Sequence, residues 1–177
     1  MKIRDVMNVS VAACGPDTDL GAAARLMWER DCGVLPVVDE SGQVIGMITD
    51  RDICIASATR VRTPGEIAAR EMLAAPVRVC RPDDDVHDAL QTMRTHALRR
   101  LPVVDDGGRL AGIVSVSDFI RRTSPGASAD GLPAEAVLDT LRAICAPSAG
   151  PSGRMGGIPE APRRRVTKGR PARTEAV

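Results

Sequence analysis

The chain has 177 residues, a formal net charge of +1 and 44% hydrophobic residues, a composition that supports a sizeable buried core and excludes an intrinsically disordered protein. Aromatic residues make up only 1% of the chain, so stacking platforms for single-stranded nucleic acid are not expected. No apolar run approaches the length of a membrane-spanning helix, and no secretory signal follows Met1. The five cysteines are odd in number and include no CxxC pair, which together with the missing signal predicts a cytoplasmic protein with reduced thiols. The lack of a membrane-spanning run predicts no membrane partner.

Charge divides the chain into two unequal parts. Residues 146–177 contain seven basic and two acidic residues, a net charge of +5, which leaves a net charge of −4 on residues 1–145. The last part is rich in Pro, Gly, Ala and Arg and is predicted to be a disordered basic tail. Such a tail is more often solvated than bound to an acidic partner, so we do not expect nucleic acid as a partner.

An internal repeat organises the first two thirds of the chain. A shift of 66 positions aligns residues 17–53 with residues 83–119 and gives 12 identities in 37 pairs, where chance gives about two. The clearest block is Leu35-Pro36-Val37-Val38-Asp39, which returns as Leu101-Pro102-Val103-Val104-Asp105. Neither copy is long enough to bury a sheet alone, so we expect two copies packed sheet to sheet about a pseudo-twofold axis.

Each copy is predicted to fold as β–α–β–β–α. After acidic N-cap signals at 17–19 and 83–85, apolar residues recur at helical spacing, and a glycine-containing turn then separates two short apolar strands. The predicted elements of the first copy are a strand over Ser10–Ala13, a helix from Leu20, strands over Leu35–Val38 and Val44–Ile48, and a helix from Thr49. Those of the second copy are a strand over Val77–Cys80, a helix from Val86, strands over Leu101–Val104 and Leu110–Val114, and a helix from Ser115.

Capping signals and composition set the remaining boundaries. Thr63-Pro64-Gly65-Glu66 is a capping box with proline at the first helical position, and it predicts a short helix over Glu66–Met72. Helical periodicity returns near the end of the chain, after a Ser/Pro/Gly/Ala-rich linker. The predicted segments are repeat one over 1–60, a linker helix over 61–72, repeat two over 73–122, a linker over 123–132, a helix over 133–145 and the tail over 146–177.

The repeat carries the same motif twice. The Leu-Pro-Val-Val-Asp block is followed by Gly46-Met47-Ile48-Thr49-Asp50-Arg51-Asp52 in one copy and by Gly112-Ile113-Val114-Ser115-Val116-Ser117-Asp118 in the other. In these residues the chain resembles a tandem pair of cystathionine-β-synthase-type (CBS) domains over residues 1–122. The resemblance implies an α/β (α+β) fold of two β-α-β-β-α repeats. Residues 4–7, 49–53, 96–102 and 141–145 also resemble stand-alone CBS proteins of the actinobacterial hypoxic-response type.

The start of each second helix suits a nucleoside phosphate. Thr49 and Ser115 lie where a strand gives way to a helix, whose free N–H groups and dipole attract phosphate. Asp52 and Asp118 follow three residues later on the same face, and a carboxylate there can accept both hydroxyl hydrogens of a ribose. The structural alternative is ordinary helix capping. The resemblance implies that these pairs bind an adenine nucleotide such as AMP, ADP or ATP, with S-adenosyl ligands as an alternative.

The two predicted clefts differ. Arg100 lies at the position that often supplies an arginine to the ligand phosphate in CBS pairs, whereas the first copy has Gly33-Val34 there. We therefore expect the second copy's motif to prefer phosphates, and the first copy's motif to rely on Arg51 or on the other copy. Apolar side chains of the predicted first strands are expected to line the adenine pockets or to be plain core, namely Val11, Ala12, Val77 and Val79.

Catalysis and metal binding find little support in the sequence. The chain has two histidines and no nucleophile elbow, Walker loop or HExxH motif, so we expect neither an enzyme nor a required cofactor. Members of the hypoxic-response type have been associated with zinc, which makes a metal or redox stress protein an alternative. Only Cys14, His96 and Cys145 match positions of that type, and segment 120–122 has arginine where a histidine would serve, so we assign no metal ligands.

These patterns together predict a regulatory module. We expect an adenine nucleotide to bind in one or both clefts between the repeats and to signal to an unknown regulated protein through a change of conformation. CBS pairs usually form flat dimers through their helices, so the resemblance also implies a homodimer. A ligand-free dimer scaffold is the third alternative.

Overall fold

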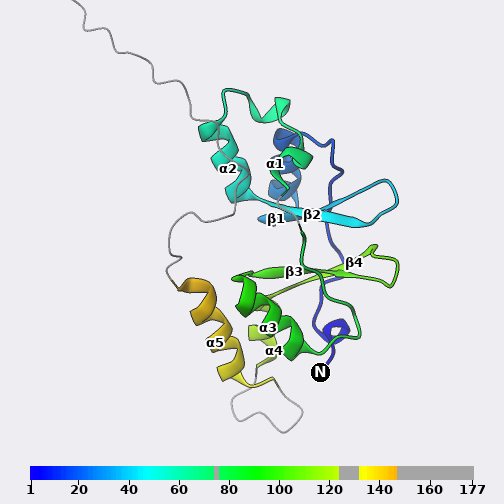
Figure 1. Cartoon of the computed structure of the whole chain (residues 1–177), viewed down its shortest axis with the longest axis vertical. Coiled ribbons are helices and arrows are strands. Elements are labelled where there is room, and N and C mark those ends of the chain that lie inside the picture. Colours follow the sequence, from blue (N-terminus) through cyan, green and yellow to red (C-terminus); the bar gives the residue numbers. More distant parts are fainter. Residues whose placement is uncertain (74–75, 124–131, 147–177) are drawn as a thin grey trace, which may run out of the picture.

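A computed structural model of the chain describes residues 1–73, 76–123 and 132–146. Two two-stranded sheets lie next to each other at the centre, with helices on the outer side of each (Figure 1). Most of the predicted linker over 123–132 and nearly all of the predicted tail over 146–177 lie outside the described residues. None of the described helices is long and apolar enough to cross a bilayer.

The two halves repeat the same order of elements. In the first half, α1 (Leu20–Glu29) precedes the antiparallel strands β1 (Val34–Val38) and β2 (Val44–Thr49), and α2 (Asp50–Thr59) follows β2 directly. In the second half, α3 (Val86–His96) precedes β3 (Arg100–Val104) and β4 (Leu110–Ser115), which α4 (Val116–Arg122) follows. These elements confirm the α/β (α+β) fold of two repeats that the sequence predicts.

The predicted first strand of each half, over Ser10–Ala13 and Val77–Cys80, is wrong in extent. Each segment makes a single parallel bridge, from Cys14 to Val37 and from Cys80 to Val103. Cys14 N donates to the Pro36 carbonyl at 3.0 Å, and Val38 N donates to the Cys14 carbonyl at 2.9 Å. The next hydrogen bond of such a ladder needs the N–H of Pro36, which proline lacks, so the pairing ends after one step.

The predicted helix over Glu66–Met72 is also wrong, because the chain forms two separate turns, η2 (Pro64–Glu66) and η3 (Ala69–Met72). The capping box itself is present, with Thr63 N and Thr63 Oγ1 donating to Glu66 Oε2 at 2.8 and 2.9 Å. Ile67 breaks the helix because it is extended and fully buried, and its carbonyl accepts a hydrogen bond from Leu20 N at 2.9 Å. A tertiary contact therefore overrides the local helical signal.

Each half is completed by the segment that precedes the other half in the chain. Ile3, in the short helix η1 (Ile3–Asp5), is fully buried in the core of the second half. Ile67 and Ala69 are fully buried in the core of the first half. Two ion pairs 66 positions apart repeat this exchange, Arg4 with Asp83 and Arg70 with Asp17. The two segments that precede the halves in the chain therefore tie the halves to each other.

The turns between paired strands join the halves at one end. Val44 N donates to the Gly108 carbonyl at 3.1 Å, and Leu110 N donates to the Gly42 carbonyl at 3.2 Å. Both glycines have positive φ, 82° for Gly42 and 78° for Gly108, a conformation that a residue without a β-carbon adopts at little cost. This junction fixes the two sheets relative to each other.

The helix α5 (Ala134–Cys145) makes the two halves unequal. It packs beside α3 and α4 (Figure 1). Val137 on α5 and the preceding Leu132 are buried in the same core as Phe119. In the first half the three-residue 3-10 helix η2 contacts α1 and α2, and no described α-helix packs on both as α5 packs on α3 and α4.

Candidate functional site

A cleft of about 660 Å³ lies between the two halves. Residues of the first half form one wall, and the ends of β3 and β4 together with the start of α4 form the other. The lining residues are Asn8, Ser10, Val11, Ala12, Glu29, Arg30, Asp31, Cys32, Gly33, Val34, Arg100, Ile113, Ser115 and Asp118.

Arg100 and Ser115 are brought together by strand pairing. Arg100 is the first residue of β3, Ser115 is the last residue of β4, and the two are direct partners in the antiparallel register. Side chains of such directly opposed residues point to the same face of the sheet. The register therefore places an exposed guanidinium beside the hydroxyl at the start of α4.

The carboxylate of Asp118 has two partners within the chain. Ser115 N and Ser115 Oγ donate to Asp118 Oδ2 at 2.7 and 2.5 Å, and Asp118 Oδ1 pairs with Arg121. These bonds form a helix capping box, which is the alternative to a ligand role that the sequence leaves open. The Asp118 side chain is 12% exposed and lines the cleft, so its capping role leaves it open to a ligand from the cleft side.

The first half repeats the capping box but not the guanidinium. Thr49 N and Thr49 Oγ1 donate to Asp52 Oδ2 at 2.9 and 2.7 Å. The strand partner of Thr49 is Val34, where the second half has Arg100 beside Ser115. The second motif therefore has a guanidinium beside its hydroxyl and the first motif has an apolar side chain there, which is the difference that the sequence predicts.

The predicted site residues fall into two groups. The structure brings five of them into the cleft, namely Val11, Ala12, Arg100, Ser115 and Asp118. The other five lie outside this cleft, namely Thr49, Arg51, Asp52, Val77 and Val79. Because the halves face each other about the pseudo-twofold axis, Val11 and Ala12 of the first half lie in the same cleft as the motif of the second half. A ligand role for the second group stays a prediction.

Sequence reasoning missed the wall formed by residues 29–34. This segment ends α1 and turns into β1 through Asp31, which has a positive φ of 48°. The sequence did contain a signal, because the repeat aligns Gly33-Val34 with Arg99-Arg100 and so marks this turn as the counterpart of a predicted ligand position. Which motif the turn faces depends on the packing of the halves, and the alignment carries no information on that packing.

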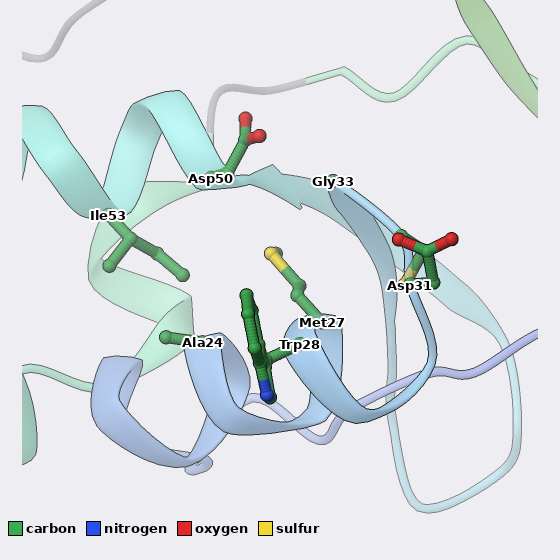
Figure 2. Close-up of a pocket in the computed structure, with 8 residues that line it drawn as sticks. Ala24, Met27, Trp28, Asp31, Gly33, Asp50 and Ile53 are labelled. Atoms are coloured by element: carbon green, nitrogen blue, oxygen red, sulfur yellow. The ribbon is translucent and has the colours of Figure 1, made fainter.

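A second cavity, of about 400 Å³, opens between α1 and α2 on the outer side of the first half. Figure 2 shows Trp28 and Met27 rising from α1 towards α2, with Ile53 facing them from α2 and Asp31 and Asp50 at the edge. Trp28 is 87% exposed. The Asp31–Gly33 turn lines both this cavity and the cleft, so a shift of the turn changes both.

The cysteines do not assemble a metal centre in the described part of one chain. No group of three or more His, Cys, Asp or Glu residues there is arranged to hold a metal ion. Burial raises the pKa of the Cys14 thiol, and burial together with the nearby Asp84 charge raises the pKa of Cys80 to about 12. A raised pKa favours the protonated form, so Cys14 and Cys80 are buried thiols rather than thiolates in the metal-free chain.

Comparison with known families agrees with this architecture. The family model for the CBS domain matches residues 3–59 and 69–124. The chain belongs to the CBS-domain family. Within the residues that the structure describes, this CBS pair shows no catalytic domain.

Relatives of this CBS pair include stand-alone proteins. The chain is 34% identical over 146 residues to Hypoxic response protein 1 of Mycobacterium tuberculosis, covering 82% of this chain and 95% of that protein. A crystal structure of Hypoxic Response Protein I with two coordinated zinc ions superposes with a TM-score of 0.65 at 33% identity, covering 70% of this chain and all of that one.

A third comparison concerns ligands. A CBS domain pair solved in complex with 5′-methylthioadenosine and S-adenosyl-L-methionine superposes with a TM-score of 0.60 at 28% identity. The match covers 68% of this chain and 98% of that one.

Proposed function

We propose that this CBS pair is a regulatory module that binds an adenine nucleotide, or a related adenosine compound, in the cleft between its halves. The observation that carries the proposal is the convergence of Arg100, Ser115 and Asp118 of one half with Val11 and Ala12 of the other in a single cleft of about 660 Å³. That volume lies in the usual range for small-molecule sites. A related CBS pair bound to two adenosine compounds supports the same ligand class.

Each lining group has a chemical role in this proposal. The Asp118 carboxylate accepts hydrogen bonds from the ribose hydroxyls, while its capping bond to Ser115 N holds it in place. Arg100 provides a planar guanidinium for an anionic group on the 5′ side. Val11, Ala12 and Ile113 supply apolar contacts to the adenine. The Thr49 and Asp52 pair, with Arg51, Val77 and Val79, is proposed as a second and weaker position.

Ligand binding is proposed to reach the outer surface through the Asp31–Gly33 turn. This turn lines the cleft on one side and the cavity between α1 and α2 on the other. A ligand that holds the turn in one position also fixes the outer cavity, and a partner that contacts this cavity responds to the ligand. A second copy of the chain on the α1–α2 surface is thus expected to respond to the ligand, and the dimer is proposed to carry the change to the regulated protein.

The same surface is proposed to form the homodimer contact. On the second half, α5 covers α3 and α4, whereas among the described residues α1 and α2 have the three-residue helix η2 in place of such an α-helix. Trp28, 87% exposed beside the cavity, gives this surface a large apolar side chain of the kind that anchors interfaces. We expect Trp28→Ala to shift the protein towards monomer in analytical ultracentrifugation, and Leu138→Ala on the outer side of α5 to leave the dimer intact.

The ligand site is tested with two matched variants. Asp118→Ala and Asp52→Ala each remove the carboxylate of a capping box, so both are expected to lose a similar stability of about 0.5–2 kcal/mol. Only Asp118 lines the cleft. Calorimetric titration of the protein with AMP, ATP and S-adenosylmethionine should show binding that Asp118→Ala abolishes and Asp52→Ala largely keeps.

Three outcomes would contradict the proposal. Absence of binding by the folded wild-type protein at millimolar concentrations of every adenosine compound would favour the ligand-free scaffold. Equal binding by wild type and Asp118→Ala would place the ligand elsewhere. Zinc is added separately to EDTA-treated protein in the same titration, and stoichiometric zinc binding without adenosine binding would favour the metal-linked alternative.

A further inference from the structure

Besides Asp118, four charged residues line the cleft, two of each sign. Arg30 and Arg100 provide two guanidinium groups, and Glu29 and Asp31 provide two carboxylates. Three of the four come from the segment that ends α1 and turns into β1, on the wall opposite the start of α4. If Asp118 binds the ribose, the remaining charged groups of the cleft sum to zero.

A balanced set of charges is a poor match for a polyphosphate. Each phosphate added to adenosine brings further negative charge, and beyond the two guanidinium groups it meets the carboxylates of Glu29 and Asp31. Like charges cost binding free energy, and because Glu29 and Asp31 are exposed this cost is modest and is screened by salt. The cleft therefore opposes the triphosphate end of ATP.

The same set matches a substituent that carries both charges. An α-amino acid group presents a carboxylate, which a guanidinium binds in a planar two-bond arrangement, and an ammonium, which pairs with a carboxylate. Arg100 and Arg30 on one hand, and Glu29 and Asp31 on the other, offer both kinds of partner within one cleft. The amino acid group itself carries no net charge, so it avoids the repulsion that the added charges of a polyphosphate meet at Glu29 and Asp31.

We propose that this cleft prefers an adenosine compound whose 5′ substituent carries an α-amino acid group, of the S-adenosylmethionine class, over adenine polyphosphates. The inference rests on the proposed function, because it assigns the ligand class of that same site. It names Glu29 and Asp31 as the residues that determine specificity.

The test compares ligands that differ only in the 5′ substituent. Dissociation constants are measured by calorimetry at low and at physiological salt for S-adenosylmethionine, 5′-methylthioadenosine, AMP and ATP. 5′-Methylthioadenosine lacks both the amino acid group and the sulfonium charge, so it reports the contribution of the uncharged adenosine part. We expect S-adenosylmethionine to bind about tenfold more tightly than either ATP or 5′-methylthioadenosine, with a smaller advantage at higher salt.

Charge-neutralising variants then identify the residues. Glu29→Gln with Asp31→Asn keeps the shapes, and asparagine tolerates the positive φ at position 31. We expect the advantage of S-adenosylmethionine over ATP to fall to about threefold or less in this variant. Glu40→Gln with Glu135→Gln removes the same formal charge from exposed positions outside the cleft and should leave the ratio unchanged.

The outcomes separate this inference from the proposed function. ATP binding as tightly as S-adenosylmethionine, or an unchanged ratio in the Glu29 and Asp31 variant, would overturn the ligand preference while leaving an adenosine site. No binding of any of the four compounds by folded wild-type protein would instead overturn the proposed function, and this inference with it.

Discussion

Gly112 leaves room for the N-terminal segment to lie close against β4, and replacing it with alanine tests how the cleft is built. A β-carbon at position 112 would lie 2.9 Å from the Asn8 carbonyl oxygen and 3.1 Å from Met7 Sδ. That carbonyl has little freedom, because it accepts the Ile113 N–H at 2.9 Å while Asn8 N donates to the Ile113 carbonyl at 2.9 Å. The new methyl group must therefore push backbone rather than a flexible side chain.

The expected cost of Gly112→Ala follows from this clash. Overpacking of this kind destabilises a protein by about 1–3 kcal/mol, which lowers the melting temperature of a chain of this size by roughly 2–12 °C. Asn8 also lines the cleft together with Val11 and Ala12. We therefore expect weaker binding of adenosine compounds in Gly112→Ala even at temperatures where the variant is fully folded.

Gly46→Ala is the matched control, because Gly46 occupies the equivalent position in β2. Its added β-carbon would lie 2.5 Å from Leu73 Cδ2, the end of a side chain that can change rotamer. We expect Gly46→Ala to cost less than Gly112→Ala in urea-induced unfolding and to leave ligand binding unchanged. A Gly112→Ala variant within about 0.5 kcal/mol of wild type, or one more stable than Gly46→Ala, would refute the reasoning.

Three further predictions concern stability. Folding raises the pKa of the Cys80 thiol from 9.0 to about 12. The contribution of this thiol to the free energy of unfolding is therefore complete below pH 9 and is lost as the pH rises towards 12. Urea midpoints should fall over this window, and Cys80→Ala should lessen the fall. Hydrogen bonds from the His87 backbone and side chain lower the pKa of Asp85. The contribution of this carboxylate to stability is therefore present above its unfolded pKa and is lost as the pH falls through the folded value. An Asp85→Asn variant with an unchanged acid unfolding transition would count against this. Leu132→Ala should cost about 2–5 kcal/mol because Leu132 is 1% exposed, whereas Leu138→Ala, 45% exposed on α5, should cost under about 1 kcal/mol, and similar unfolding midpoints for the two would contradict the packing described.

The local features of this protein are determined by the sequence itself. The 66-residue repeat predicts two copies of the same elements, and the capping boxes at Thr49 and Ser115 form within four residues of chain. Such features depend on backbone geometry and on side chains a few positions apart, so they can be predicted without knowledge of packing. The inequality of the two motifs likewise follows from Arg100 and Val34 at matching positions.

The tertiary structure decided the features that depend on distant backbone contacts. Ile67 breaks a predicted helix because its carbonyl bonds Leu20 N and its side chain is fully buried. The pseudo-twofold packing places the 29–34 wall opposite Ser115 and Asp118, and α5 covers only one of two equivalent helix pairs. Because the two copies share their local signals, only the contacts between copies distinguish them, and those contacts join residues that lie far apart in the sequence.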